Sequence, residues 1–332
     1  MRGLTLICAA LCIVASPAQA KTYNGMAFAG PTISGDSVVW GTEYSDGSGA
    51  VKVGGRIVAR FERMTGKGEK RQFGGTPGAV SASPTRMAYT LDDSRQLPGG
   101  DGDSGASTVS VQPLVSVDGS PFTNPLGCDA AYVTTAIDGD TVVLGVDDEP
   151  PCGGVYVDGR KIAEAEPCQV RIAGPYVAWR TSPCGGSATI TVADRVSGAV
   201  VASLTPAKGV RTWGVFDLDE SGNIVAAEGE RVVAFSLADP RRYVLAKKSW
   251  SSTVATADGR AAFITVDENV GPERLLLTDL RGKVLERLDR YGKRRWPEGE
   301  IALTDRWVAW SVKRDIYDHP TGPGNVFLKR IG

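Results

Sequence analysis

The sequence predicts an all-β fold, a β-propeller of seven four-stranded blades, from three observations. One short pattern recurs along the whole chain after the first twenty residues. Each copy is followed by stretches in which apolar and polar residues alternate, as is typical of half-buried strands. The 332 residues include 41 glycines and 19 prolines, which suit many turns and few helices. Units of about four short strands, at a period of about 45 residues, are characteristic of propellers.

The first twenty residues precede the predicted domain. Arg2 supplies a positive charge, an apolar run covers residues 4–14, and Ala18-Gln19-Ala20 fits a cleavage site. This order is typical of a secretory signal peptide, with a retained anchor as the alternative. We therefore expect an exported protein, secreted or periplasmic, with the propeller over residues 21–332. Later apolar runs fall short of the roughly 20 residues that a spanning helix needs, so no membrane span is expected.

The repeated pattern is a turn, then two small or β-branched residues, then an aromatic residue. Its clearest copies are "IAGPYVAW" (172–179) and "LTDRWVAW" (303–310). We expect the last residue of each copy to end the innermost strand of a blade. Because the tryptophans recur at equivalent places, we interpret them as packing residues between blades and not as platforms for sugars. The copies end at Trp40, Tyr89, Leu144, Trp179, Ala226, Phe263 and Trp310.

A family resemblance supports this architecture. The segment "TVADRVSGAVVASL" (191–204) and the "GPYVAW" type of turn resemble the repeats of WD-repeat, YVTN and TolB-like propellers. The resemblance implies a propeller over residues 21–332, but it implies little about activity, because propellers have many unrelated functions. No Trp-Asp dipeptide closes the repeats, which departs from the WD-repeat pattern.

The two ends of the chain indicate how the ring closes. After the last copy only one good strand remains, "NVFLKRI" (325–331), whereas "GMAFAGPTIS" (25–34) before the first copy fits an outer strand. We expect the last blade to take its outer strand from the N-terminal segment, which ties the ends together. The alternative is six blades plus an irregular one, because the copy that ends at Ala226 lacks the aromatic residue.

Four cysteines follow the signal segment: Cys128, Cys152, Cys168 and Cys184. An even number in an exported chain predicts two disulfides, and three pairings are open. Equivalent places in the repeat favour Cys128–Cys152 with Cys168–Cys184, and the pair Cys152–Cys168 within one blade is the alternative. Zinc is disfavoured, because no C-x-x-C pair occurs and the single histidine, His319, is far away in the sequence.

The loops that follow the aromatic residues are acidic. In the expected register they surround the axis on one face of the ring, where like charges add their fields and could attract a cation, an amine or a basic peptide. The alternative is an ordinary solvated surface, since exposed loops are commonly charged. The candidate ligand-binding residues are Asp92, Asp93, Asp101, Asp103, Asp147, Asp148, Asp267 and Glu268.

One segment matches the spacing of a calcium loop. In "DLDESGNIVAAE" (217–228), Asp217, Asp219 and Ser221 occupy positions 1, 3 and 5, and Glu228 occupies position 12. Such a loop needs flanking helices, whereas here Glu228 ends a strand that is about 17 Å long. We therefore expect an ordinary turn and no cofactor, with calcium as the open alternative.

The expected function is that of a monomeric binding or scaffolding module for an unknown protein or glycan partner. The chain has 37 Lys and Arg residues against 38 Asp and Glu residues, and nucleic-acid-binding domains are usually clearly basic. No catalytic residue is predicted, because His319 is the only histidine and no G-x-S-x-G turn is present. The alternative is a polysaccharide hydrolase or lyase, which needs two carboxyl groups about 5–10 Å apart in the channel.

Overall fold

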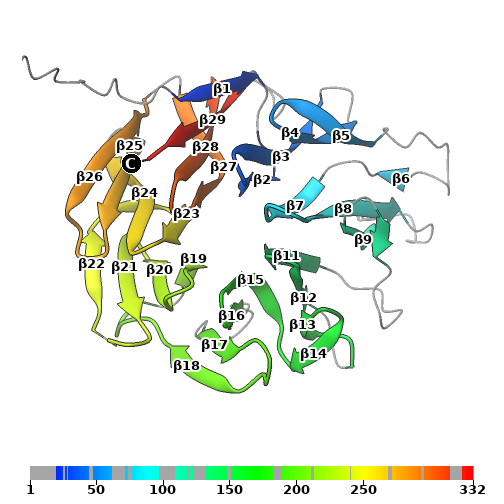
Figure 1. The fold of residues 1–332 in the computed structure, drawn as a ribbon, viewed down its shortest axis with the longest axis horizontal. Helices are drawn as coiled ribbons and strands as arrows, with labels where there is room; N and C mark the ends of the chain where they lie inside the picture. The colour runs from blue at the N-terminus through cyan, green and yellow to red at the C-terminus, as the bar shows by residue number, and fades with distance from the viewer. Residues whose placement is uncertain are drawn as a thin grey trace, which may run out of the picture.

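The protein folds as a ring of antiparallel sheets around a central axis (Figure 1). The structure is a computed structural model that describes residues 20–24, 27, 29–44, 48–61, 72–73, 77–96, 109–117, 120–122, 132–147, 151–181, 189–210, 213–239, 241–267, 271–292, 295–314 and 324–331. Every regular element in these ranges is a β-strand. The predicted all-β propeller fold is confirmed. A search of these residues found no helix with the length and apolar character needed to cross a membrane.

Within the described residues, six of the sheets have four strands each. In these sheets the strands lie side by side in chain order, except where the two chain ends meet. The first contains β2 (Ala29–Ser34), β3 (Ser37–Glu43), β4 (Gly49–Val53) and β5 (Arg56–Phe61). Then come β11 (Tyr132–Asp138), β12 (Thr141–Asp147), β13 (Gly154–Val157) and β14 (Arg160–Ala163), followed by β15 (Pro167–Ala173), β16 (Tyr176–Thr181), β17 (Ile190–Asp194) and β18 (Val200–Leu204). The next two contain β19 (Trp213–Leu218), β20 (Asn223–Glu228), β21 (Arg231–Ser236) and β22 (Tyr243–Ala246), then β23 (Ser249–Ala257), β24 (Arg260–Asp267), β25 (Gly271–Asp279) and β26 (Val284–Arg290).

The ring closes as the sequence predicted, through an N-terminal strand. The last sheet contains β27 (Arg295–Leu303), β28 (Trp307–Arg314) and β29 (Gly324–Arg330), and β1 (Lys21–Asn24) completes it by pairing with β29. The strand that closes the ring is shorter and earlier than expected. Residues 29–34 of the segment assigned to it instead form β2, the first strand of the first sheet.

The sheet after β5 is irregular. It contains β7 (Pro77–Ala82), β8 (Met87–Gln96), β9 (Val109–Val117) and β10 (Ser120–Phe122), and β6 (Gln72–Phe73) pairs with β8 as a fifth strand. The preferred expectation of seven four-stranded blades is therefore corrected to six regular blades and one irregular sheet. The irregular unit is the second along the chain, where the long strand β8 extends beyond β7 and pairs with β6. The fifth unit, which lacks the aromatic residue, is a regular four-stranded sheet.

The expected register was wrong by one strand. The first strand of each sheet lies nearest the axis, so β2, β7, β11, β15, β19, β23 and β27 surround the channel (Figure 1). The repeated pattern ends in the second strands, with Trp40 in β3, Trp179 in β16 and Trp310 in β28. A second strand is buried on both faces, as the five consecutive buried residues of β3 show, and so it carries the clearest apolar signal.

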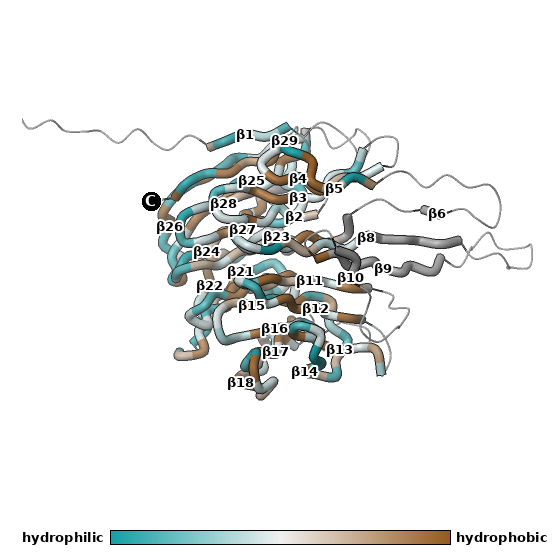
Figure 2. Tube along the Cα trace, turned by 45° about the vertical axis from the view of Figure 1, so that its right-hand side comes forward, coloured by the Kyte–Doolittle hydropathy of each residue, from teal (hydrophilic) through white to brown (hydrophobic). Residues whose placement is uncertain are grey.

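The tryptophans pack between neighbouring sheets, as predicted. Trp40 of the first sheet is buried against Val326 and Leu328 of the last one. Trp179 and Trp310 are buried in the same way between their own sheet and the preceding one. Figure 2 shows the resulting contrast between hydrophobic stretches (brown) in β3 and β4 and the hydrophilic outer strand β1 (teal). Each sheet thus buries faces that it could not bury alone.

Candidate functional site

A cavity of about 620 Å³ lies on the axis, at the end of the ring where the first and second strands of each sheet are joined by turns. Its walls are the last residues of the innermost strands, together with the turns that follow them. We call this end of the ring the turn face. The loops between second and third strands lie at the opposite end, because consecutive antiparallel strands alternate in direction.

The cavity is a cup with a charged floor. Its deepest charged lining residues are Arg171 of β15, Asp217 of β19 and Glu300 of β27. One or two positions further from the turns, Gln169, Val170 and Phe216 do not line the cavity and are buried. Val170 and Phe216 belong to hydrophobic clusters between sheets, so the three charged residues, which we call the floor, are the last lining residues of the cup before this packed region.

Arg171 is the centre of the floor. Its Nε lies 3.3 Å from Oδ1 of Asp217, and its Nη2 lies 3.2 Å from Oε2 of Glu300. The backbone N–H of Thr256 donates a 2.8 Å hydrogen bond to the other oxygen of Asp217. Innermost strands from three different sheets, β15, β19 and β27, thus place one guanidinium between two carboxylates.

A β-bulge brings Glu300 to the floor. The pairing of β27 with β28 shifts register between Glu298 and Ala302. Within the bulge Gly299 has a φ of +70°, and a Cβ atom there would lie 2.1 Å from the carbonyl oxygen of Gly30. Only glycine fits such a position, and bulges commonly redirect a side chain next to a functional site.

Burial and charge act on the carboxyl group of Asp217 in opposite directions. Its side chain is 21% exposed, and desolvation by burial raises its pKa from 3.8 to about 6. The neighbouring Arg171 and the hydrogen bond from Thr256 lower the pKa, and these effects offset part of the rise. Asp217 therefore changes protonation near pH 6 while Arg171 remains charged.

Carboxylates dominate the lining of the cup. Seven acidic side chains and one guanidinium, that of Arg171, line it in the part of the chain that the structure describes. Their fields add in a concave site with walls of low dielectric, which raises the local concentration of cations. The seven acidic residues are Asp138, Asp217, Asp219, Glu220, Asp258, Glu300 and Asp305.

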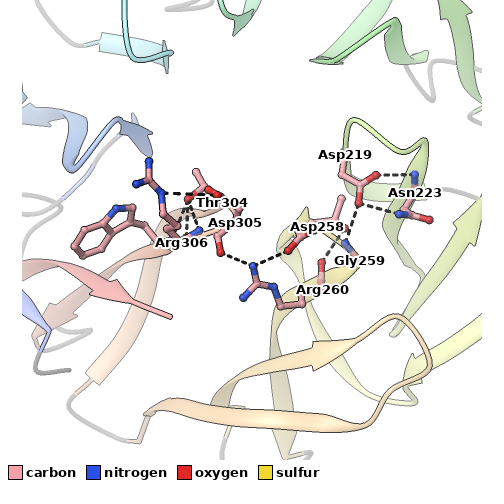
Figure 3. A network of polar contacts seen from close by, with 10 residues as sticks. Asp219, Asn223, Asp258, Gly259, Arg260, Thr304, Asp305 and Arg306 are labelled. Atoms are coloured by element: carbon pink, nitrogen blue, oxygen red, sulfur yellow. Dashed lines mark hydrogen bonds and ion pairs between the residues drawn. The ribbon is translucent and has the colours of Figure 1, made fainter. Parts of the chain in front are cut away.

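Polar contacts hold the rim of the cup together. Arg260 reaches from β24 to the adjoining sheet, where its Nη2 donates to the carbonyl oxygen of Asp305 at 2.5 Å, and it also contacts Asp258 at 3.2 Å (Figure 3). Other hydrogen bonds at this end of the ring join residues at or just after the ends of innermost strands in neighbouring sheets. These bonds are Ser34 Oγ to Ser83 O (2.7 Å), Ser83 Oγ to Gly139 O (2.7 Å), Gly174 N to Asp138 Oδ2 (2.8 Å) and Gly259 N to Asp219 Oδ2 (3.3 Å).

The segment with calcium-loop spacing does not bring its acidic side chains together. Asp219 accepts hydrogen bonds from the backbone N–H groups of Ser221, Asn223 and Gly259 and from the amide side chain of Asn223 (Figure 3). Its carboxylate thus stabilises the turn between β19 and β20. Asp217 faces Arg171, and Glu228 lies at the far end of β20. The described residues contain no group of three or more histidine, cysteine or acidic side chains that could hold a metal ion.

Among the described lining residues of the cup, Asp147, one of the eight predicted ligand-binding acids, is absent. Asp92 and Asp93 belong to β8, and Asp147 and Asp267 end the second strands β12 and β24, away from the turn face. Because the register differs by one strand, Asp147 and Asp267 lie at the end of the ring opposite the cup, and ligand binding by the predicted acids stays a prediction. Asp101, Asp103, Asp148 and Glu268 lie outside the described residues.

The predicted disulfides also involve residues beyond those described. Cys128 and Cys184 lie outside the described ranges, as does His319. Cys168 belongs to β15, and its Sγ lies 3.3 Å from the carbonyl oxygen of Arg180. The pairings Cys128–Cys152 and Cys168–Cys184 remain predictions.

Sequence reasoning missed Arg171 and Glu300. A signal for Arg171 exists, since it is the one charged residue in the seven-residue strand β15. For Glu300 the signal is the preceding Gly299 inside a strand, which often marks a bulge. Neither signal shows that the two residues meet.

Comparisons with known proteins show the fold alone. No family model and no curated protein matches the chain. A structure from a study of two prolyl endopeptidases is similar, with a TM-score of 0.55 and 16% identity over 88% of this chain. A chain of the mitotic checkpoint complex has a TM-score of 0.53 and 11% identity, over 100% of this chain and 99% of its own. The WD40 propeller domain of Doa1 has a TM-score of 0.49 and 8% identity, over 93% of this chain and 97% of its own. This chain spans 45% of the prolyl endopeptidase chain.

Proposed function

We propose that this protein is an exported binding or scaffolding module that takes a positively charged group of its ligand or partner into the cup on the turn face. The observation that carries the proposal is the lining of the cup, with seven carboxylates around a cavity of about 620 Å³. Export is supported by the signal-like segment of residues 1–20. The structural neighbours add only that the fold is a propeller, and because propellers have many unrelated functions, the proposal rests on the cup itself.

Calorimetric titration with spermine and with a tetralysine peptide tests this proposal. The affinity should fall with added salt, because exposed charges are screened over about 10 Å at 0.1 M ionic strength. A triple variant, Glu220→Gln/Asp258→Asn/Asp305→Asn, removes three charges from the cup. It should weaken binding by at least about tenfold, since charges around a concavity act together.

A matched control separates the cup from the general charge of the protein. The variant Glu164→Gln/Glu230→Gln/Glu273→Gln removes the same number of charges from residues that do not line the cup. Its affinity for tetralysine should stay within about twofold of the parent protein, because these charges lie outside the cup and are screened by salt. Equal losses in the two triple variants, or no measurable binding of either probe, would refute the cup as the site.

A second function, a polysaccharide hydrolase or lyase, is favoured by one observation. Asp217 and Glu300 contact the same guanidinium, and the pKa of Asp217 is raised to about 6, as a general acid requires. The described lining residues include no aromatic side chain on which a sugar ring could stack. We therefore rank this function below binding. Turnover of any member of a glycan panel, abolished by Asp217→Asn, would reverse that order.

A further inference from the structure

The ion pair between Arg171 and Glu300 joins two sheets that are not neighbours, unlike the other inter-sheet polar contacts of the described residues. Those contacts join neighbouring sheets, as Arg260 does with Asp305 and Lys329 does with Glu286. Arg171 and Glu300 are 129 positions apart in the sequence. Two sheets, β19–β22 and β23–β26, lie between theirs on one side of the ring (Figure 1). The ion pair therefore crosses the channel.

The two ends of this contact are anchored differently. Arg171 has a side chain that is 20% exposed and is fixed from the side by Asp217, whereas the side chain of Glu300 is 49% exposed. Glu300 follows Gly299 in the bulge of β27 and lines the cup. Glu300 is thus the end of the pair that can leave with the smaller change in packing.

We infer that the Arg171–Glu300 pair is a releasable strap across the channel. While the strap is closed, it forms the floor of the cup and ties β15 to the opposite strand β27. When Glu300 leaves Arg171, water gains access to the contact between Gln169 and Phe216 beneath the floor. In this contact the backbone N–H of Phe216 donates to Oε1 of Gln169 at 3.2 Å, and Nε2 of Gln169 donates to the carbonyl oxygen of Phe216 at 2.9 Å. This inference requires no ligand, so it can fail while the proposed binding function holds, and the reverse is also true.

Amide hydrogen exchange at Phe216 tests the strap. In Glu300→Gln the amide of Phe216 should exchange about fivefold faster than in the parent protein, which corresponds to about 1 kcal/mol for a partly exposed ion pair. Glu300→Asp keeps the charge but shortens the reach, and it should give an intermediate rate. The matched control is Glu286→Gln, which removes an ion pair between neighbouring sheets and should leave Phe216 unchanged.

Two results would overturn the strap. One is a rate at Phe216 that is the same in Glu300→Gln as in Glu286→Gln. The other is a uniform acceleration of exchange in all sheets of Glu300→Gln, accompanied by a lower melting temperature, because this would show a general loss of stability. A local acceleration confined to β15, β19 and β27, seen also in Glu300→Asp, supports the strap even if Glu300→Gln is less stable.

Discussion

Replacing Gly299 by alanine should disturb the bulge that directs Glu300 into the cup. The position has a φ of +70°, and the left-handed conformation costs an L-residue about 1–2 kcal/mol. The new Cβ would also lie 2.1 Å from the carbonyl oxygen of Gly30 and 3.3 Å from that of Ala27. Both atoms belong to the backbone, so relief requires a shift of β27 relative to the first sheet. Overpacking of this kind costs about 1–3 kcal/mol more.

Urea denaturation of Gly299→Ala should therefore show a loss of about 2–5 kcal/mol in the free energy of unfolding. The control is Gly35→Ala, because Gly35 has a φ of +56° and an added Cβ would meet nothing within 4 Å. It should lose only the conformational part, about 1–2 kcal/mol. If Gly299→Ala is no less stable than Gly35→Ala, the close contact with Gly30 does not exist and the account of the bulge is wrong.

Three further predictions concern single residues. The pKa of Asp217 is raised to about 6, so the folded state holds a proton that the unfolded state releases near pH 4; the stability due to this proton is present below pH 4 and is lost as pH rises through 6. Denaturation at several pH values should show this loss, at most about 3 kcal/mol, in the parent protein and not in Asp217→Asn. Trp179→Ala should cost about 3–5 kcal/mol in a thermal or urea melt, because Trp179 is buried between sheets; a neutral effect would contradict its packing role. Arg242→Met should cost about 3 kcal/mol, because it leaves the fully buried carboxylate of Glu228 without the cation 2.8 Å away, whereas Glu228→Gln/Arg242→Met should recover part of that loss.

The fold could be predicted from the sequence because the same short pattern recurs in each repeat along the chain. Second strands such as β3 and β16 are largely buried, and their apolar pattern recurs once in each sheet. The same strong signal led to the wrong register, because the repeated pattern was assigned to the innermost strands and in fact ends in the second strands. The innermost strands carry both apolar and polar residues, because they border a polar channel, and such a mixed pattern predicts turns or outer strands.

The site could not be predicted for a geometric reason. Arg171 and Glu300 lie on sheets that are not neighbours, and only the curvature of the closed ring brings them within 3.2 Å. No local pattern records that curvature. The acidic loops can be recognised in the sequence. Shifting the assigned register by one strand, however, reverses the direction of each assigned strand, so loops expected on one face of the ring lie on the other. Asp147 and Asp217 illustrate the exchange, since one ends a second strand and the other lies on the floor of the cup.

A titration of the isotope-labelled protein with spermine, followed by amide chemical shifts, tests the central claim most directly. If the cup takes a cationic group, the shifts that change first should belong to residues 217–221, Asp258 and Asp305 on the turn face. Changes confined to the opposite end of the ring, around Asp147 and Asp267, would contradict the account and return the binding surface to the acidic loops.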